Sequence, residues 1–84
     1  MTDLYDVLHH RAFHLRSRRA SEAEWVDLLH DQPVTDPARA VRDFIEQRNR
    51  VVEQADRRGR KPLPRLVRIE DGGTIYIQPE GFKP

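Results

Sequence analysis

Basic side chains gather in one stretch of this sequence, RRGRKPLPRLVR, which covers residues 57–68. Six of its twelve residues are basic and none is acidic, although the formal net charge of the 84-residue chain is only +1. Closely spaced cations can neutralise successive phosphates of a nucleic-acid backbone. Alternatively, they complement the C-terminal dipole of a helix and keep an edge strand soluble. The candidate phosphate-binding residues of this run are Arg57, Arg58, Arg60, Lys61, Arg65 and Arg68.

A second basic cluster lies near the N-terminus, where Arg16, Arg18 and Arg19 occupy a predicted turn. Residues 1–35 carry a net charge of −2 and residues 36–84 a net charge of +3. The local clustering favours a nucleic-acid partner, with duplex DNA as the first choice, bound at the two basic clusters. The near-neutral total favours the alternative, a protein-interaction module or inhibitor whose charged faces meet a partner protein.

Side chains for catalysis or metal binding are sparse. The sequence has no cysteine, its two serines are Ser17 in the basic turn and Ser21 at a predicted helix cap, and it has no Gly-rich phosphate loop. His10 and His14 are four residues apart, but the pair lacks the Glu and the third ligand of a zinc protease motif. We therefore expect a protein that is not an enzyme and needs no metal or other cofactor.

Three helices are predicted to position these groups. An apolar stripe predicts the first helix over residues 3–18, and the capping box SEAE begins a second, acidic helix over residues 21–31. Asp36-Pro37 begins a third helix, which continues to about residue 58 before Gly59 ends it. Its outward face places opposite charges four residues apart, as at Arg39/Asp43 and Glu46/Arg50, which is typical of a salt-bridged, solvated helix.

The hydrophobic period changes from helical to twofold in residues 63–78. The segment EDGG supplies turn residues between two alternating runs, which predicts a β-hairpin. We expect one face of this hairpin to carry Val67, Ile69, Ile75 and Ile77. The fold class is therefore α+β, a single small domain over residues 1–84 with three helices followed by a C-terminal hairpin.

Two residues depart from the helical pattern. Phe13 projects away from the apolar stripe of its helix, and Arg48 lies within the apolar stripe of the third helix. A buried, unpaired guanidinium is costly, so Arg48 must pair with an acid, reach the edge of the stripe or lie between subunits. We assign both residues to an interface and expect a homodimer or higher assembly.

The order of elements, together with PRLVRIEDGGTIYIQPEG, resembles a winged-helix DNA-binding domain. The resemblance implies that the third helix reads the major groove, which nominates Arg39, Arg42 and Arg50, and that the wing contacts phosphates through Arg65 and Arg68. It implies a DNA-binding regulator of transcription or an accessory factor. The acidic second helix departs from this pattern, because it would repel phosphate.

No apolar run approaches the roughly 18 residues of a membrane span, and the N-terminus MTDLYDVLHH lacks the pattern of a secretory signal. We therefore expect a cytoplasmic protein with no membrane partner.

Overall fold

The structure of the protein is a computed structural model that describes residues 3–59 and 63–83. Its elements follow one another as α1 (Leu4–Arg11), the 3₁₀ helix η1 (Phe13–Ser17), β1 (Ala20–Ser21), α2 (Glu22–Asp27), α3 (Pro37–Arg57), β2 (Leu66–Asp71) and β3 (Thr74–Pro79). The α+β fold class predicted from the sequence, with three helices before a C-terminal hairpin, is confirmed.

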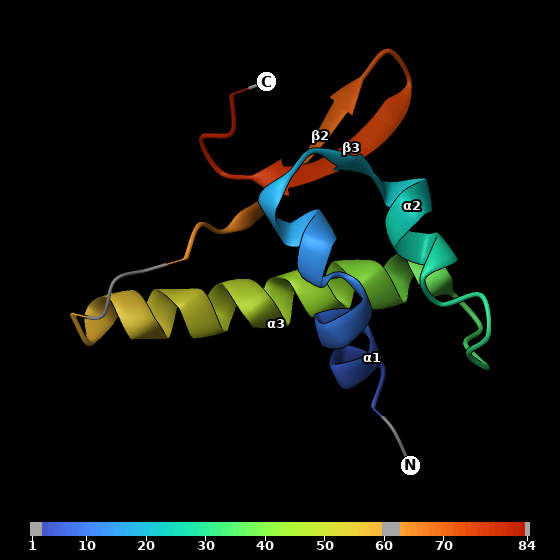
Figure 1. The fold of residues 1–84 in the computed structure, drawn as a ribbon, viewed down its shortest axis with the longest axis horizontal. Helices are drawn as coiled ribbons and strands as arrows, with labels where there is room; N and C mark the ends of the chain where they lie inside the picture. Colours follow the sequence, from blue (N-terminus) through green and yellow to red (C-terminus); the bar gives the residue numbers. More distant parts are fainter. Residues whose placement is uncertain (1–2, 60–62, 84) are drawn as a thin grey trace.

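In Figure 1 the hairpin lies above α3, η1 and α2 lie between them, and α1 crosses α3 and extends below it. The buried apolar side chains form one cluster that draws on every helix and strand. The largest fully buried side chains are Trp25, Leu8, Leu66, Ile77 and Val41. Among the described residues, no helix is sufficiently long and apolar to cross a membrane.

The predicted first helix is divided in two. The α-helix ends at Arg11, and the N–H of Leu15 donates to the carbonyl of Ala12 at 2.9 Å, the three-residue spacing of a 3₁₀ turn. Leu15 is buried, as the apolar stripe predicts, while Phe13 is 73% exposed. The tighter turn leads into β1, a two-residue strand that the periodicity of the sequence does not reveal.

The two remaining helices begin where their caps predict. Ser21 and Glu24 form the capping box of α2, with hydrogen bonds of 3.2 Å and 3.0 Å. The helix ends at Asp27, earlier than expected, and the chain continues in turns. Asp36 caps α3 with Pro37 in the first turn, and the observed end at Arg57 agrees with the prediction.

The three antiparallel strands are ordered β1-β3-β2. Gly72 and Gly73 form the two-residue turn of the hairpin, and both have positive φ, at 60° and 84°. Residues that pair across antiparallel strands share a face of the sheet, and Arg68 pairs with Ile77 while Ile69 pairs with Tyr76.

The predicted apolar face of the hairpin is therefore wrong. Ile77 is fully buried on the face it shares with Leu66, whereas Ile69 lies on the opposite face and is 39% exposed. Because a two-residue turn pairs odd-numbered residues of β2 with even-numbered residues of β3, Val67 and Ile69 cannot share a face with Ile75 and Ile77.

Candidate nucleic-acid interface

The structure divides the basic run of residues 57–68 between separate elements. Arg57 and Arg58 are exposed at the end of α3, Arg65 precedes β2, and Arg68 belongs to that strand. Arg60 and Lys61 lie outside the described residues. The run therefore does not form one basic surface in the part of the chain that the structure describes.

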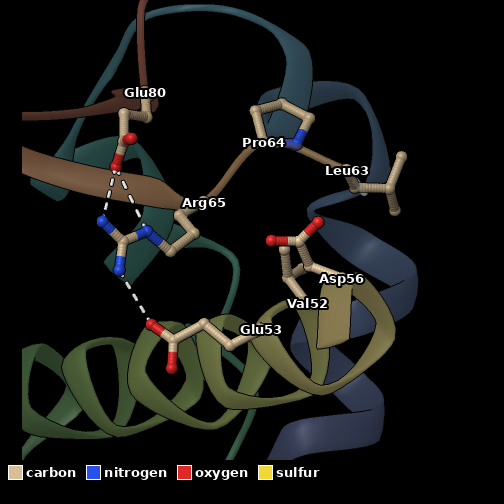
Figure 2. Close-up of a pocket in the computed structure, with 7 residues that line it drawn as sticks. All are labelled: Val52, Glu53, Asp56, Leu63, Pro64, Arg65 and Glu80. Atoms are coloured by element: carbon tan, nitrogen blue, oxygen red, sulfur yellow. Dashed lines mark hydrogen bonds and ion pairs between the residues drawn. The ribbon is translucent and has the colours of Figure 1, made fainter. Parts of the chain in front are cut away.

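Arg65 is held between two carboxylates. Its Nη1 lies 2.8 Å from Glu53 on α3, and its Nη2 lies 2.9 Å from Glu80 after β3 (Figure 2). Its Nε also donates to Glu80 at 3.2 Å. These hydrogen bonds raise the pKa of Arg65 above its usual value. Arg65 thus links α3 to the chain that follows β3, and its charge is neutralised.

The pocket around Arg65 has the wrong charge for phosphate. Its volume is about 390 Å³, and Figure 2 shows Glu53, Asp56 and Glu80 around the single guanidinium of Arg65. Three carboxylates against one cation leave a local charge of −2. No group of three side chains suited to hold a metal ion occurs among residues 3–59 and 63–83.

The other cations near the sheet are also paired. Arg68 lies 3.2 Å from Glu22 and Arg18 lies 3.3 Å from Glu24, so the acidic side chains of α2 neutralise arginines from both predicted clusters. Arg19 lies 2.9 Å from Asp71, and its guanidinium stacks over the Tyr76 ring at 3.9 Å from the centroid. These ion pairs fasten the sheet to α2 and to the preceding turn.

Arg16 differs from its neighbours Arg18 and Arg19. It stacks on the ring of Phe13 at 4.9 Å from the centroid, and it has no ion pair with any described residue. Arg48 is buried, as the apolar stripe of α3 predicts. Its Nη1 donates to the carbonyl of Pro64 at 3.0 Å, and no described carboxylate pairs with it. Both residues line a groove beside η1.

The outward side of α3 also differs from expectation. Neither Arg39/Asp43 nor Glu46/Arg50 forms an ion pair within 4.0 Å, and Glu53, which lies four residues before Arg57, binds Arg65. We define the outer face of α3 as the exposed charged residues of this helix that do not line the pocket of Figure 2. They are Arg39, Arg42, Asp43, Glu46, Arg50 and Arg57.

The histidine pair does not lie on one helix, because α1 ends before His14, which belongs to η1. His9 stacks against Tyr5 with ring centroids 6.1 Å apart. Burial, together with the positive charge of Arg16, lowers the pKa of His9.

We compared the chain with protein-family models, with curated proteins and with solved structures, and none of the three comparisons gave a match.

Proposed function

We propose that this protein binds duplex nucleic acid through the outer face of α3, as a small DNA-binding regulator or accessory factor. The observation that supports this role is that four exposed arginines on this face have no ion pair with a described carboxylate. Set against Asp43 and Glu46, the four arginines leave this face with a net charge of +2. The arginines of the sheet are paired with carboxylates and so give no such excess of positive charge.

The shape of α3 suits this role. Its 21 residues form a rod of about 31 Å, and an α-helix fits the major groove of B-DNA, which is about 12 Å wide. Arginine is the side chain that best matches phosphate and guanine, because its planar guanidinium donates two parallel hydrogen bonds. The order of three helices and a hairpin also supports the winged-helix resemblance, in which the third helix enters the groove.

The proposal changes the expected contacts within that resemblance. Arg65 and Arg68 of the hairpin are bound by carboxylates, so the phosphate contacts fall mainly to Arg39, Arg50 and Arg57 on α3. The acidic α2 no longer argues against DNA, because two of its acids serve as partners for arginines.

Binding to a fluorescein-labelled duplex, followed by fluorescence anisotropy over a series of salt concentrations, tests the proposal. The logarithm of the affinity should fall with the logarithm of salt concentration, with a slope of about −0.9 for each phosphate contact. The double variant Arg39→Gln/Arg50→Gln should make this slope shallower by roughly two units.

The matched control removes two arginines that are already paired. Arg18→Gln/Arg68→Gln removes the same charge and should leave the slope unchanged, because Glu24 and Glu22 neutralise these residues. The absence of salt-sensitive binding by the wild-type protein at low ionic strength would show that the proposal is wrong.

A second candidate function is recognition of a protein partner. It is favoured by the groove beside η1, where two large apolar side chains, Phe13 and Leu63, are 73% and 62% exposed.

A further inference from the structure

The groove beside η1 combines exposed apolar walls with positive charge. It has a volume of about 210 Å³ and is formed where η1 meets α3 and the segment before β2, by Phe13, Arg16, Ser17, Arg48, Leu63 and Pro64. Leu63 and Pro64 also line the acidic pocket of Figure 2, so this segment separates a negatively charged pocket from a positively charged groove. The two sites therefore suit ligands of opposite charge.

Arg48 lies at the buried side of the groove. Arg48 is 6% exposed as a residue, and its only hydrogen bond from the side chain to a described residue runs from Nη1 to the carbonyl of Pro64. A guanidinium has five N–H donors, and Arg48 is one of the residues that line the groove. Burial, with the positive charge of Arg16 nearby, lowers the pKa of Arg48.

The dimensions of the groove limit what can occupy it. Pockets that bury a drug-sized molecule measure about 300–1,000 Å³, so this groove has room for little more than one large side chain. Two cations without a described carboxylate partner, Arg16 and Arg48, favour an anion beside that side chain. A charge-assisted hydrogen bond from arginine to a carboxylate is roughly twice as strong as a hydrogen bond between neutral groups.

A second copy of this chain docked groove to groove does not meet these requirements. When the twofold axis of a dimer passes through the groove, the groove meets itself, so Arg16 and Arg48 of one copy would face the same cations of the other. Like charges in a partly dehydrated interface repel each other. The groove therefore calls for a chemically different partner.

We infer that the groove docks a segment of another protein that presents one carboxylate beside a large apolar side chain. The apolar side chain packs against Phe13 and Leu63, and the carboxylate accepts hydrogen bonds from Arg48 and Arg16. This inference rests on the second candidate function and is independent of DNA binding, because Arg48 lies on the buried side of α3, away from its outer face.

The test is a titration of the ¹⁵N-labelled protein with two synthetic peptides, followed by NMR. Both peptides are acetyl-Gly-Leu-Phe, one with a free C-terminal carboxylate and the other with a C-terminal amide. The peptide with the free carboxylate should cause saturable chemical-shift changes at Phe13, Arg16 and Arg48. It should bind about tenfold more tightly than the peptide amide.

A pair of exposed apolar residues supplies the matched variants. Phe13→Ser should weaken binding of the carboxylate peptide by about tenfold. Val51→Ser should leave it unchanged, because Val51 is 58% exposed on α3 but does not line the groove. The comparison of the two peptides on the wild-type protein needs no variant and therefore does not depend on the folding of either one.

The outcomes distinguish a failure of this inference from a failure of the second candidate function, recognition of a protein partner. If both peptides bind equally well, the groove is a protein-binding surface, but carboxylate recognition is wrong. If neither binds up to about 10 mM, both the inference and protein binding at this groove fail. Sedimentation of the same sample completes the test, because a dimer that Phe13→Ser converts to monomer would mean that a second copy covers the groove.

Discussion

The side-chain amide of Asn49 hydrogen-bonds both backbone polar groups of Leu66. Its Nδ2 donates to the carbonyl at 3.0 Å, and its Oδ1 accepts from the N–H at 2.9 Å. Leu66 begins β2, an edge strand of the sheet, and its pair with Pro79 is one that leaves the N–H and carbonyl of Leu66 pointing away from β3. A side chain of α3 thus takes the place of a neighbouring strand at the start of β2.

Replacing Asn49 by Leu should destabilise the protein by roughly 2–3 kcal/mol, because the N–H and carbonyl of a buried residue lose their partners together. Urea unfolding followed by circular dichroism measures this cost. Gln47→Leu makes a similar change at an exposed position of the same helix and should cost about 0.5 kcal/mol or less. Equal costs for the two variants would show that the bonds to Leu66 contribute little.

The ion pair between Arg11 and Asp31 should make stability depend on pH. Arg11 donates to the two carboxylate oxygens of Asp31 at 2.6 Å and 2.9 Å, which holds the pKa of Asp31 well below its usual value. A lowered pKa in the folded state stabilises the protein above the unfolded pKa of about 4, and this contribution is lost as the pH falls further.

Asp31→Asn should therefore lower the melting temperature at pH 7, and the difference from wild type should shrink progressively below about pH 4. Asp27→Asn is the control, because the Asp27 carboxylate has no hydrogen bond or ion pair with a described residue. A difference in melting temperature that persists unchanged at pH 2 would contradict this account.

Substitutions at the two glycines of the hairpin turn should differ in their effect on stability. Gly72→Asn keeps a residue that tolerates positive φ and should change stability by less than about 0.5 kcal/mol. Gly73→Val forces a β-branched residue to a φ of 84° and should cost more than about 1 kcal/mol. No side chain crowds either position, so backbone strain alone sets the cost. Chemical denaturation that finds both variants equally stable would contradict this reasoning.

Local signals in the sequence predicted the elements well. The caps at Ser21 and Asp36 act over three residues, so the beginnings of α2 and α3 could be read directly. Which hairpin residues share a face of the sheet could also have been derived from the sequence, because a two-residue turn at Gly72-Gly73 fixes which residues pair. The strand β1 could not, since its two residues form a strand only by pairing with β3.

The candidate sites depended on contacts that sequence spacing does not encode. Arg68 meets Glu22 and Arg65 meets Glu80 only after the chain folds, so the sequence overstated the charge available near the hairpin. Ion pairing along α3 was overestimated for the same reason, because Glu53 pairs with the distant Arg65. A lone asparagine within a helix, a residue with low helix propensity, was the one signal that could have pointed to the role of Asn49.

The central position of β3 in the sheet has a consequence for the rate of folding. The hairpin can form locally, but β1 can pair only when residue 77 comes back to residue 20, which lies 57 positions earlier in the chain of 84 residues. Closing so long a loop costs chain entropy before β1 and β3 contribute any favourable contact. We therefore expect the pairing of Ala20 with Ile77 to be absent from the folding transition state, so that substitutions at this contact accelerate unfolding and leave the refolding rate nearly unchanged.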